Sequence, residues 1–314
     1  MKYFIVFCTA LFVCAFMSGC KKENSLQKDS DAKISVVTTI FAPYDFARQI
    51  AGDKAEISML LPPAAESHSF EPSPKDIIKI QNSDIFIYVG GESDEWVNVI
   101  LESMDTSKMK IVTLIDCVDK LEEEIVEGMQ EEEEEEEGTV YDEHVWTSPK
   151  NAKLIVQKIA AALSQADPQN ASYYQQNAQN YISELDLLDV QFQNAVNNSN
   201  RKTVIFADRF PFRYFAHAYG LQYFAAFPGC STETEASAAT VKFLIDKVKA
   251  EKIPVVFHIE LSNEKMANTV AEASGAKIML LHSAHNISKA DFEKGLTYLE
   301  LMKQNVLNLK EALQ

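Results

Sequence analysis

Five of the six histidines in this chain stand where an α/β protein binds its ligands. His68, His258 and His282 lie at or just beyond the carboxyl ends of apolar, strand-like runs. His285 follows three residues after His282, and His144 lies in a loop between an acidic tract and a helical pattern. Parallel sheets bind ligands at the carboxyl ends of their strands, and imidazole is a common ligand of zinc and related metals. These histidines predict one composite metal site in a cleft.

The elements that must position the histidines form two similar halves. Each half has four apolar, β-branched runs of strand length, separated by helix-compatible stretches. The runs cover residues 34–40, 56–61, 84–89 and 110–115, and then 203–207, 222–227, 254–259 and 276–281. Strands that alternate with helices indicate parallel sheets. We expect an α/β protein of two lobes, each a parallel sheet of about four strands with helices on both faces.

A long helical region separates the two halves. Ser148 and Pro149 are typical of a helix start, and Asp167-Pro168 marks a restart. From there to about Val196 the chain has no glycine and no further proline, so a helix of about 40 Å is expected. The predicted organisation is an N-terminal lobe at residues 33–147, a helical linker at 148–200 and a C-terminal lobe at 201–314.

The N-terminus indicates where the protein resides. A short positive start precedes an apolar run at residues 3–17, which has the length of a signal peptide and is too short for a comfortable membrane span. Small residues directly before Cys20 resemble a bacterial lipobox. We expect a signal peptide at residues 1–19, lipidation of Cys20, a flexible tether at 20–32 and an extracytoplasmic location on the cell membrane.

The net charge and the cysteines restrict the kinds of function that the chain can have. A net charge of −17 argues against nucleic acid as a partner. Seven consecutive glutamates at residues 131–137, in an acidic loop spanning 121–138, predict a solvated loop that repels itself. Beyond Cys20 only Cys117 and Cys230 remain, and two isolated buried thiols are expected.

Two segments resemble the histidine signatures of the zinc- and manganese-binding lipoproteins of ABC importers, the ZnuA/TroA-like family. They are His68 with its Ser-Phe-Glu-Pro-Ser-Pro tail and Tyr141-Asp-Glu-His144-Val-Trp146 with its Thr-Ser-Pro continuation. The resemblance covers nearly the whole mature chain. It implies two α/β lobes joined by a backbone helix, a metal held between them, and delivery to a membrane permease driven by a cytoplasmic ATPase. It also implies a binding protein, not an enzyme.

The chain departs from the family pattern in its C-terminal lobe. The family has a third histidine followed by aspartate, where this chain has Ala207 and Asp208. The family's acidic fourth ligand falls at His282, which we expect as the third ligand here, with His258 next. Asp208 is expected either to bind the metal or to orient a histidine.

Two other residues near these strand ends are candidate ligands. His285 is either a flanking ligand or a neighbour of a helix cap, and Cys230 is a weaker thiolate candidate. The sixth histidine, His217, falls in a helical pattern and is expected to be structural.

The donor types favour Zn²⁺ over Mn²⁺, because three imidazoles suit tetrahedral zinc and manganese prefers more oxygen ligands. Histidine must be neutral to bind metal, so affinity should fall below about pH 6. The alternatives are a binding protein for manganese or a metal chelate, a surface adhesin, and a metallo-hydrolase with Glu66 or Glu260 as base. A monomer is expected.

Overall fold

The computed structural model describes residues 33–66, 70–129, 139–231 and 235–314. Residues Lys33–Gln314 form one compact unit. The predicted signal peptide, lipidated Cys20, tether, His68 and the seven-glutamate tract lie outside the described residues. In the part of the chain that is described, no helix has the length and apolar character needed to cross a membrane.

The N-terminal lobe contains a four-stranded parallel sheet with strand order β2-β1-β3-β4. Its strands are β1 (Ile34–Thr38), β2 (Ala55–Met59), β3 (Ile85–Tyr88) and β4 (Lys110–Thr113). Its helices are α1 (Phe41–Ala51), α2 (Pro74–Gln81) and α3 (Glu95–Ser103), with short 3₁₀ turns η1 (Glu92–Asp94) and η2 (Leu114–Cys117). Helix α2 begins where a Ser73–Asp76 capping box and Pro74 satisfy its first turn.

The C-terminal lobe repeats this plan with strand order β6-β5-β7-β8, again all parallel. Its strands are β5 (Thr203–Arg209), β6 (Gln222–Phe227), β7 (Val255–His258) and β8 (Lys277–Leu280). Its helices are α6 (Arg213–Tyr219), α7 (Ala238–Glu251) and α8 (Lys265–Ser274). The prediction of two α/β lobes with four-stranded parallel sheets is therefore confirmed.

The strand order places a switch point in each lobe. The chain leaves β1 towards β2 on one side, while β3 pairs on the other side, and β5 has the same relation to β6 and β7. Loops that leave neighbouring strands in opposite directions open a crevice at the carboxyl ends. The segments after β1, β3, β5 and β7 are therefore the expected walls of a binding site.

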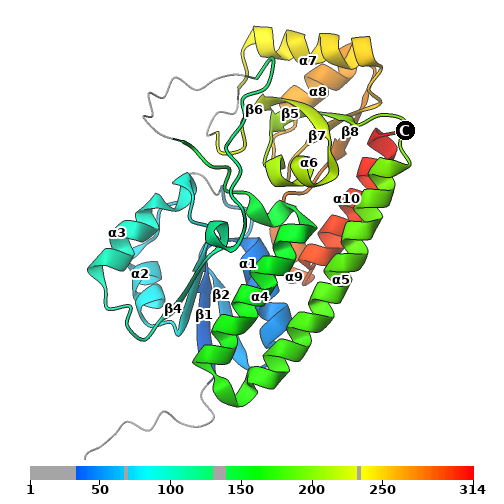
Figure 1. Ribbon diagram of the computed structural model, residues 1–314. Helices are drawn as coiled ribbons and strands as arrows, with labels where there is room; N and C mark the ends of the chain where they lie inside the picture. The colour runs from blue at the N-terminus through cyan, green and yellow to red at the C-terminus, as the bar shows by residue number, and fades with distance from the viewer. Residues whose placement is uncertain (1–32, 67–69, 130–138, 232–234) are drawn as a thin grey trace, which may run out of the picture. The chain divides into compact units, whose positions relative to one another are not determined.

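Long helices connect the lobes. After a 3₁₀ turn η3 (Val145–Thr147), the chain forms α4 (Pro149–Ala166), the short η4 (Pro168–Asn170) and the 27-residue α5 (Ala171–Asn197). At 1.5 Å per residue, α5 extends about 40 Å. Helices α9 (Lys289–Glu293) and α10 (Tyr298–Ala312) end the chain, and α5 packs against α1, α4 and α10 (Figure 1).

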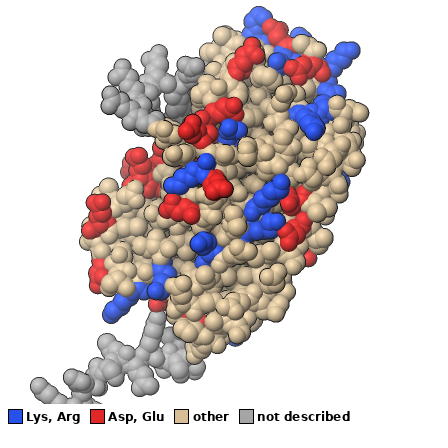
Figure 2. All heavy atoms as spheres, viewed as in Figure 1, with Lys and Arg blue, Asp and Glu red and all other residues tan. Residues whose placement is uncertain are grey.

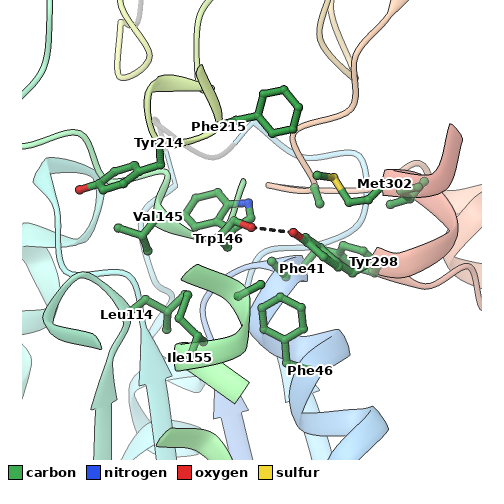
Figure 3. Packing of buried hydrophobic residues seen from close by; sticks show 14 of the residues in the cluster. Phe41, Phe46, Leu114, Val145, Trp146, Ile155, Tyr214, Phe215, Tyr298 and Met302 are labelled. Carbon is green, nitrogen blue, oxygen red and sulfur yellow. Dashed lines mark hydrogen bonds between the residues drawn. The ribbon is translucent and has the colours of Figure 1, made fainter. Parts of the chain in front are cut away.

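One hydrophobic core includes residues of both lobes and of the connecting helices. At its centre the Tyr298 hydroxyl donates to the Trp146 carbonyl at 2.8 Å, and Phe46 packs edge-on against Tyr298 (Figure 3). Trp146 is fully buried, and its indole N–H donates to the Ser283 carbonyl at 2.8 Å. The loop that contains His144 is thus held between the two lobes by the residues that follow it.

The exposed surface mixes charges of both signs. On the face shown in Figure 2, lysines and arginines lie among aspartates and glutamates, with uncharged surface between them.

Candidate metal centre

His144 is fully buried at the start of η3. Asp142 fixes its backbone, because Asp142 Oδ1 accepts from the His144 N–H at 2.8 Å, and the Thr147 hydroxyl donates to the His144 carbonyl at 2.8 Å. The ring nitrogen Nδ1 lies 3.3 Å from the same carboxylate oxygen. A carboxylate this close to one ring nitrogen helps to orient the imidazole.

His285 is the histidine that the structure places beside His144. Their ring centroids are 5.4 Å apart and the rings are nearly perpendicular. The His285 ring also packs against Trp146 at 5.0 Å. Its backbone N–H donates to Glu260 Oε1 at 3.1 Å, and its carbonyl accepts from the Phe41 N–H at 3.0 Å. Contacts with both lobes therefore position this imidazole.

A cavity of about 30 Å³ lies against the two imidazoles. Its walls come from the segments after β2, β5, β6, β7 and β8, and its polar side chains include His144, His285, Glu66, Arg209 and Glu260. This volume suits one water-sized or ion-sized occupant. The site therefore lies at the carboxyl ends of the strands, and of the four segments expected from the strand order those after β5 and β7 line it.

Arg209 brings a positive charge to the wall of this cavity. Its guanidinium makes a two-pronged ion pair with Glu66, with N–O distances of 3.1 and 3.2 Å, and also donates to the Ser231 carbonyl. Glu66 belongs to the N-terminal lobe and Arg209 ends β5, so the pair joins the lobes. The Glu66 carboxylate offsets the charge of Arg209 beside a site that would hold a cation.

The two carboxylates considered as a hydrolytic base are both engaged. Glu66 pairs with Arg209. Glu260 accepts from the Ser283 N–H at 2.7 Å, the Ser283 hydroxyl at 2.5 Å and the His285 N–H. Glu260 therefore supports the loop after β8, and Glu66 links the two lobes through Arg209.

The three other predicted C-lobe ligands lie outside the residues that line this cavity. His282 Nδ1 accepts from the Ala284 N–H at 3.0 Å, and Asn305 binds the His282 backbone. His258 Nδ1 lies 3.0 Å from the Ile259 carbonyl. Asp208 accepts from the backbone N–H groups of Arg209 and Ile259.

The difference between His282 and His285 has a local cause. Ala284 adopts a left-handed conformation with φ of 59°, which turns the chain after β8. This turn puts His285, and not the residue nearest the strand end, against His144. A left-handed alanine gives no signal in a sequence, because the conformation is disfavoured for every residue with a Cβ.

The surroundings of His144 are strongly acidic. Burial lowers the pKa of His144, but the carboxylates of Asp142, Glu143 and Glu123 outweigh it, and the pKa is raised above its ordinary value. Burial, together with Asp142, also raises the pKa of Glu123. An interior that gathers carboxylates around an imidazole favours a bound cation.

Two parallel α/β lobes, with a buried histidine pair where their strands end, are the architecture of a two-lobed solute-binding protein. The family described as "Zinc-uptake complex component A periplasmic" matches residues 36–312, and the chain belongs to it. The resemblance drawn from the two histidine motifs is thereby confirmed.

Individual relatives agree with this assignment. The chain is 33% identical to the high-affinity zinc uptake system protein ZnuA of Bacillus subtilis, over 99% of this chain and 96% of that protein. It is 32% identical to the zinc-binding lipoprotein AdcA of Streptococcus pneumoniae, over 96% of this chain but only 59% of AdcA.

Solved structures show the same fold. The metal-dependent lipoprotein YcdH of B. subtilis has a TM-score of 0.77 at 33% identity, covering 90% of this chain and all of that one. The Zn(II)-bound ZnuA-like domain of S. pneumoniae AdcA has a TM-score of 0.74 at 31% identity, covering 90% of this chain and 99% of the domain.

Proposed function

We propose that this protein captures Zn²⁺ outside the cytoplasm and delivers it to the permease of an ABC importer driven by a cytoplasmic ATPase. The observation that carries the proposal is the pair of buried imidazoles, His144 and His285, against one ion-sized cavity. Nitrogen donors suit zinc. The names of the relatives, which describe zinc uptake and zinc binding, support the same metal.

The proposed imidazole ligands are His144, His285 and His68, with a water or carboxylate as fourth ligand. Asp142 would orient His144, and Glu260 would hold the backbone of His285. His285 is a better candidate than His282, His258 or Asp208, because His285 lines the cavity beside His144 and the other three do not. An imidazole that is protonated would have to release one proton to solvent before its ring nitrogen could bind the metal.

Competition between Zn²⁺ and Mn²⁺ for the purified protein tests the metal and its ligands. The purified protein would be exposed to a limiting mixture of Zn²⁺ and Mn²⁺, and bound metal would be measured by mass spectrometry. We expect about one zinc per chain, lost in His144→Ala and His285→Ala. His217→Ala is the matched control, because His217 is an exposed histidine on α6. Loss of zinc in His282→Ala with retention in His285→Ala would reverse the ligand assignment.

Delivery and anchoring are tested in cells. A strain that lacks its own zinc-binding protein should grow in zinc-poor medium when it carries this chain, and should fail with the His144→Ala variant. Cys20→Ala should move the protein from the membrane fraction to the soluble fraction if Cys20 carries the lipid. Unchanged membrane association of that variant would reject the lipid anchor.

A further inference from the structure

Cys230 lies next to the imidazole of His144, in the segment that follows β6. Its neighbour Gly229 packs on the His144 ring, since a Cβ added to Gly229 would lie 3.0 Å from both Nδ1 and Cε1. The Cys230 N–H approaches Glu123 Oε1 at 3.4 Å. Cys230 therefore approaches the His144 loop from the C-terminal lobe.

Three metal-binding atoms converge at this point. The donor atoms of Glu143, His144 and Cys230 all lie within 4.8 Å of one another. Glu143 and His144 are fully buried and Cys230 is partly exposed. The Ser93 hydroxyl donates to Glu143 Oε1 at 2.6 Å, which fixes the Glu143 side chain on the N-terminal lobe.

The charges around these atoms favour a cation. The Glu143 carboxylate lies within 4.8 Å of the Cys230 thiol, and the carboxylates of Asp142 and Glu143 are both buried. The nearby arginines are engaged with other carboxylates, Arg209 with Glu66 and Arg213 with Glu124. Buried carboxylates in such numbers are costly unless a positive charge offsets them.

We propose that Glu143, His144 and Cys230 form a donor set for a thiophilic divalent cation, in which the Cys230 thiolate binds the metal directly. The inference rests on the proposed zinc capture, with which it shares His144. The Cys230 thiolate takes the position given above to a water or carboxylate as fourth ligand, with Glu143 beside it. The S–H bond breaks as the S–metal bond forms, and the proton leaves to solvent, with no change of oxidation state.

The geometry requires little rearrangement. Zn–S bonds of about 2.3 Å and Zn–N and Zn–O bonds of about 2.0–2.2 Å put tetrahedral ligand atoms on the order of 3.5 Å apart. Donor atoms already within 4.8 Å reach that spacing by side-chain rotation and a shift of about one ångström. A thiolate is a soft ligand, so Cys230 would favour zinc over manganese.

The chain supplies a matched control in Cys117. Its thiol donates to the Thr113 carbonyl at 3.3 Å, and burial raises its pKa to about 11. Cys117 is absent from the three-donor cluster found among the described residues. It therefore provides a partly buried thiol outside the donor cluster.

Cobalt substitution tests the sulfur ligand. The full-length protein would be loaded with Co²⁺, and its near-ultraviolet absorption would be recorded. We expect a thiolate-to-Co²⁺ charge-transfer band that is lost in Cys230→Ser and kept in Cys117→Ser. Absence of the band, or its persistence in Cys230→Ser, would overturn the proposal.

A second measurement uses the unaltered chain and so does not depend on whether a variant folds. Zn²⁺ should protect Cys230 from alkylation, read by peptide mass spectrometry, while the alkylation of Cys117 is unchanged. Equal alkylation of Cys230 with and without zinc would also reject the sulfur ligand.

Metal selectivity separates this inference from the proposed function. Cys230→Ser should lower the ratio of bound zinc to bound manganese by at least about 10-fold, the lower end of the effect of residues that only support ligands. One zinc per chain with an unchanged ratio would reject the thiolate ligand and leave zinc capture standing. No zinc bound to the unaltered protein would reject both.

Discussion

At the scale of single residues, the orientation of His144 depends on the absence of a side chain at Gly229. A methyl group there would stand 3.0 Å from the His144 ring and 3.1 Å from the Phe210 carbonyl, closer than side-chain carbons normally approach. The His144 imidazole or the Phe210 carbonyl would have to shift to make room for it. Glycine at this position therefore serves the site and not a special backbone conformation.

Gly229→Ala should accordingly weaken zinc binding by about 10- to 100-fold, as loss of ligand support does in other metal sites. Zinc titration against a competing chelator measures the effect. Gly220→Ala is the control, because its added methyl meets no atom within 4 Å but its φ of 64° is strained. That variant should lose about 1 kcal/mol of folding stability and keep its zinc affinity.

The pKa of Asp94 predicts how the free energy of unfolding depends on pH. Burial, and then the charge of Glu143, raise its pKa to about 7 in the folded protein. Since the folded pKa exceeds the unfolded one, the contribution of Asp94 to stability is fully present below about pH 4. It is lost as the pH rises through 7, by up to about 4 kcal/mol.

Asp94→Asn should remove this dependence. In the absence of metal, the free energy of unfolding of the variant minus that of the original chain should be larger at pH 8 than at pH 5. Urea unfolding at both pH values measures this difference. The Asn side chain still accepts from the Val89 N–H, which Asp94 Oδ2 binds at 2.7 Å. An equal stability difference at the two pH values would contradict the raised pKa.

At the scale of elements, α10 holds the segment that leads to His285. Asn305 accepts from the His282 N–H and donates to the His282 carbonyl, both at 2.8 Å, and is 2% exposed. Asn308 donates to the Leu280 carbonyl at 2.7 Å. The last helix therefore replaces the hydrogen bonds that this backbone loses where β8 ends.

Asn305→Ala leaves two buried backbone groups of His282 without these partners. It should lower the free energy of unfolding by about 2–3 kcal/mol and also weaken zinc binding, because His285 lies three residues after His282 in the same segment. Thermal melting and chelator competition measure the two effects. Leu307→Ala, at a position 58% exposed on the same helix, should change neither.

The elements also show how far the sequence alone predicts the protein. The runs of β-branched residues predicted all eight strands and their parallel pairing, because buried strands are continuously apolar. The prediction that His144 lies near a binding site came from its position in a loop between an acidic tract and a helical pattern. The ion pair of Arg209 with Glu66 joins residues 143 positions apart. Neither this contact nor the left-handed Ala284 has a local signal, so His285 could not be distinguished from His282.

At the scale of the molecule, α5 and the shared core restrict how far the lobes can move. The core contains residues of both lobes, and Trp146 and Tyr298 are buried at its centre. We expect the radius of gyration, measured by small-angle X-ray scattering, to be the same with and without zinc. A contraction of several ångströms on zinc binding would show a wide hinge motion and contradict this expectation.

The packing of the last helix on the first has a consequence for the export that the proposed function requires. Asp45 on α1 accepts from the Tyr298 N–H at 2.8 Å, and Phe46 packs on the Tyr298 ring, across 253 positions of the chain. A polypeptide threaded through a membrane from its amino end would expose α1 long before α10 arrives to cover it. Completion of the first lobe must therefore wait until translocation ends, and the nascent protein would need protection from aggregation throughout its passage.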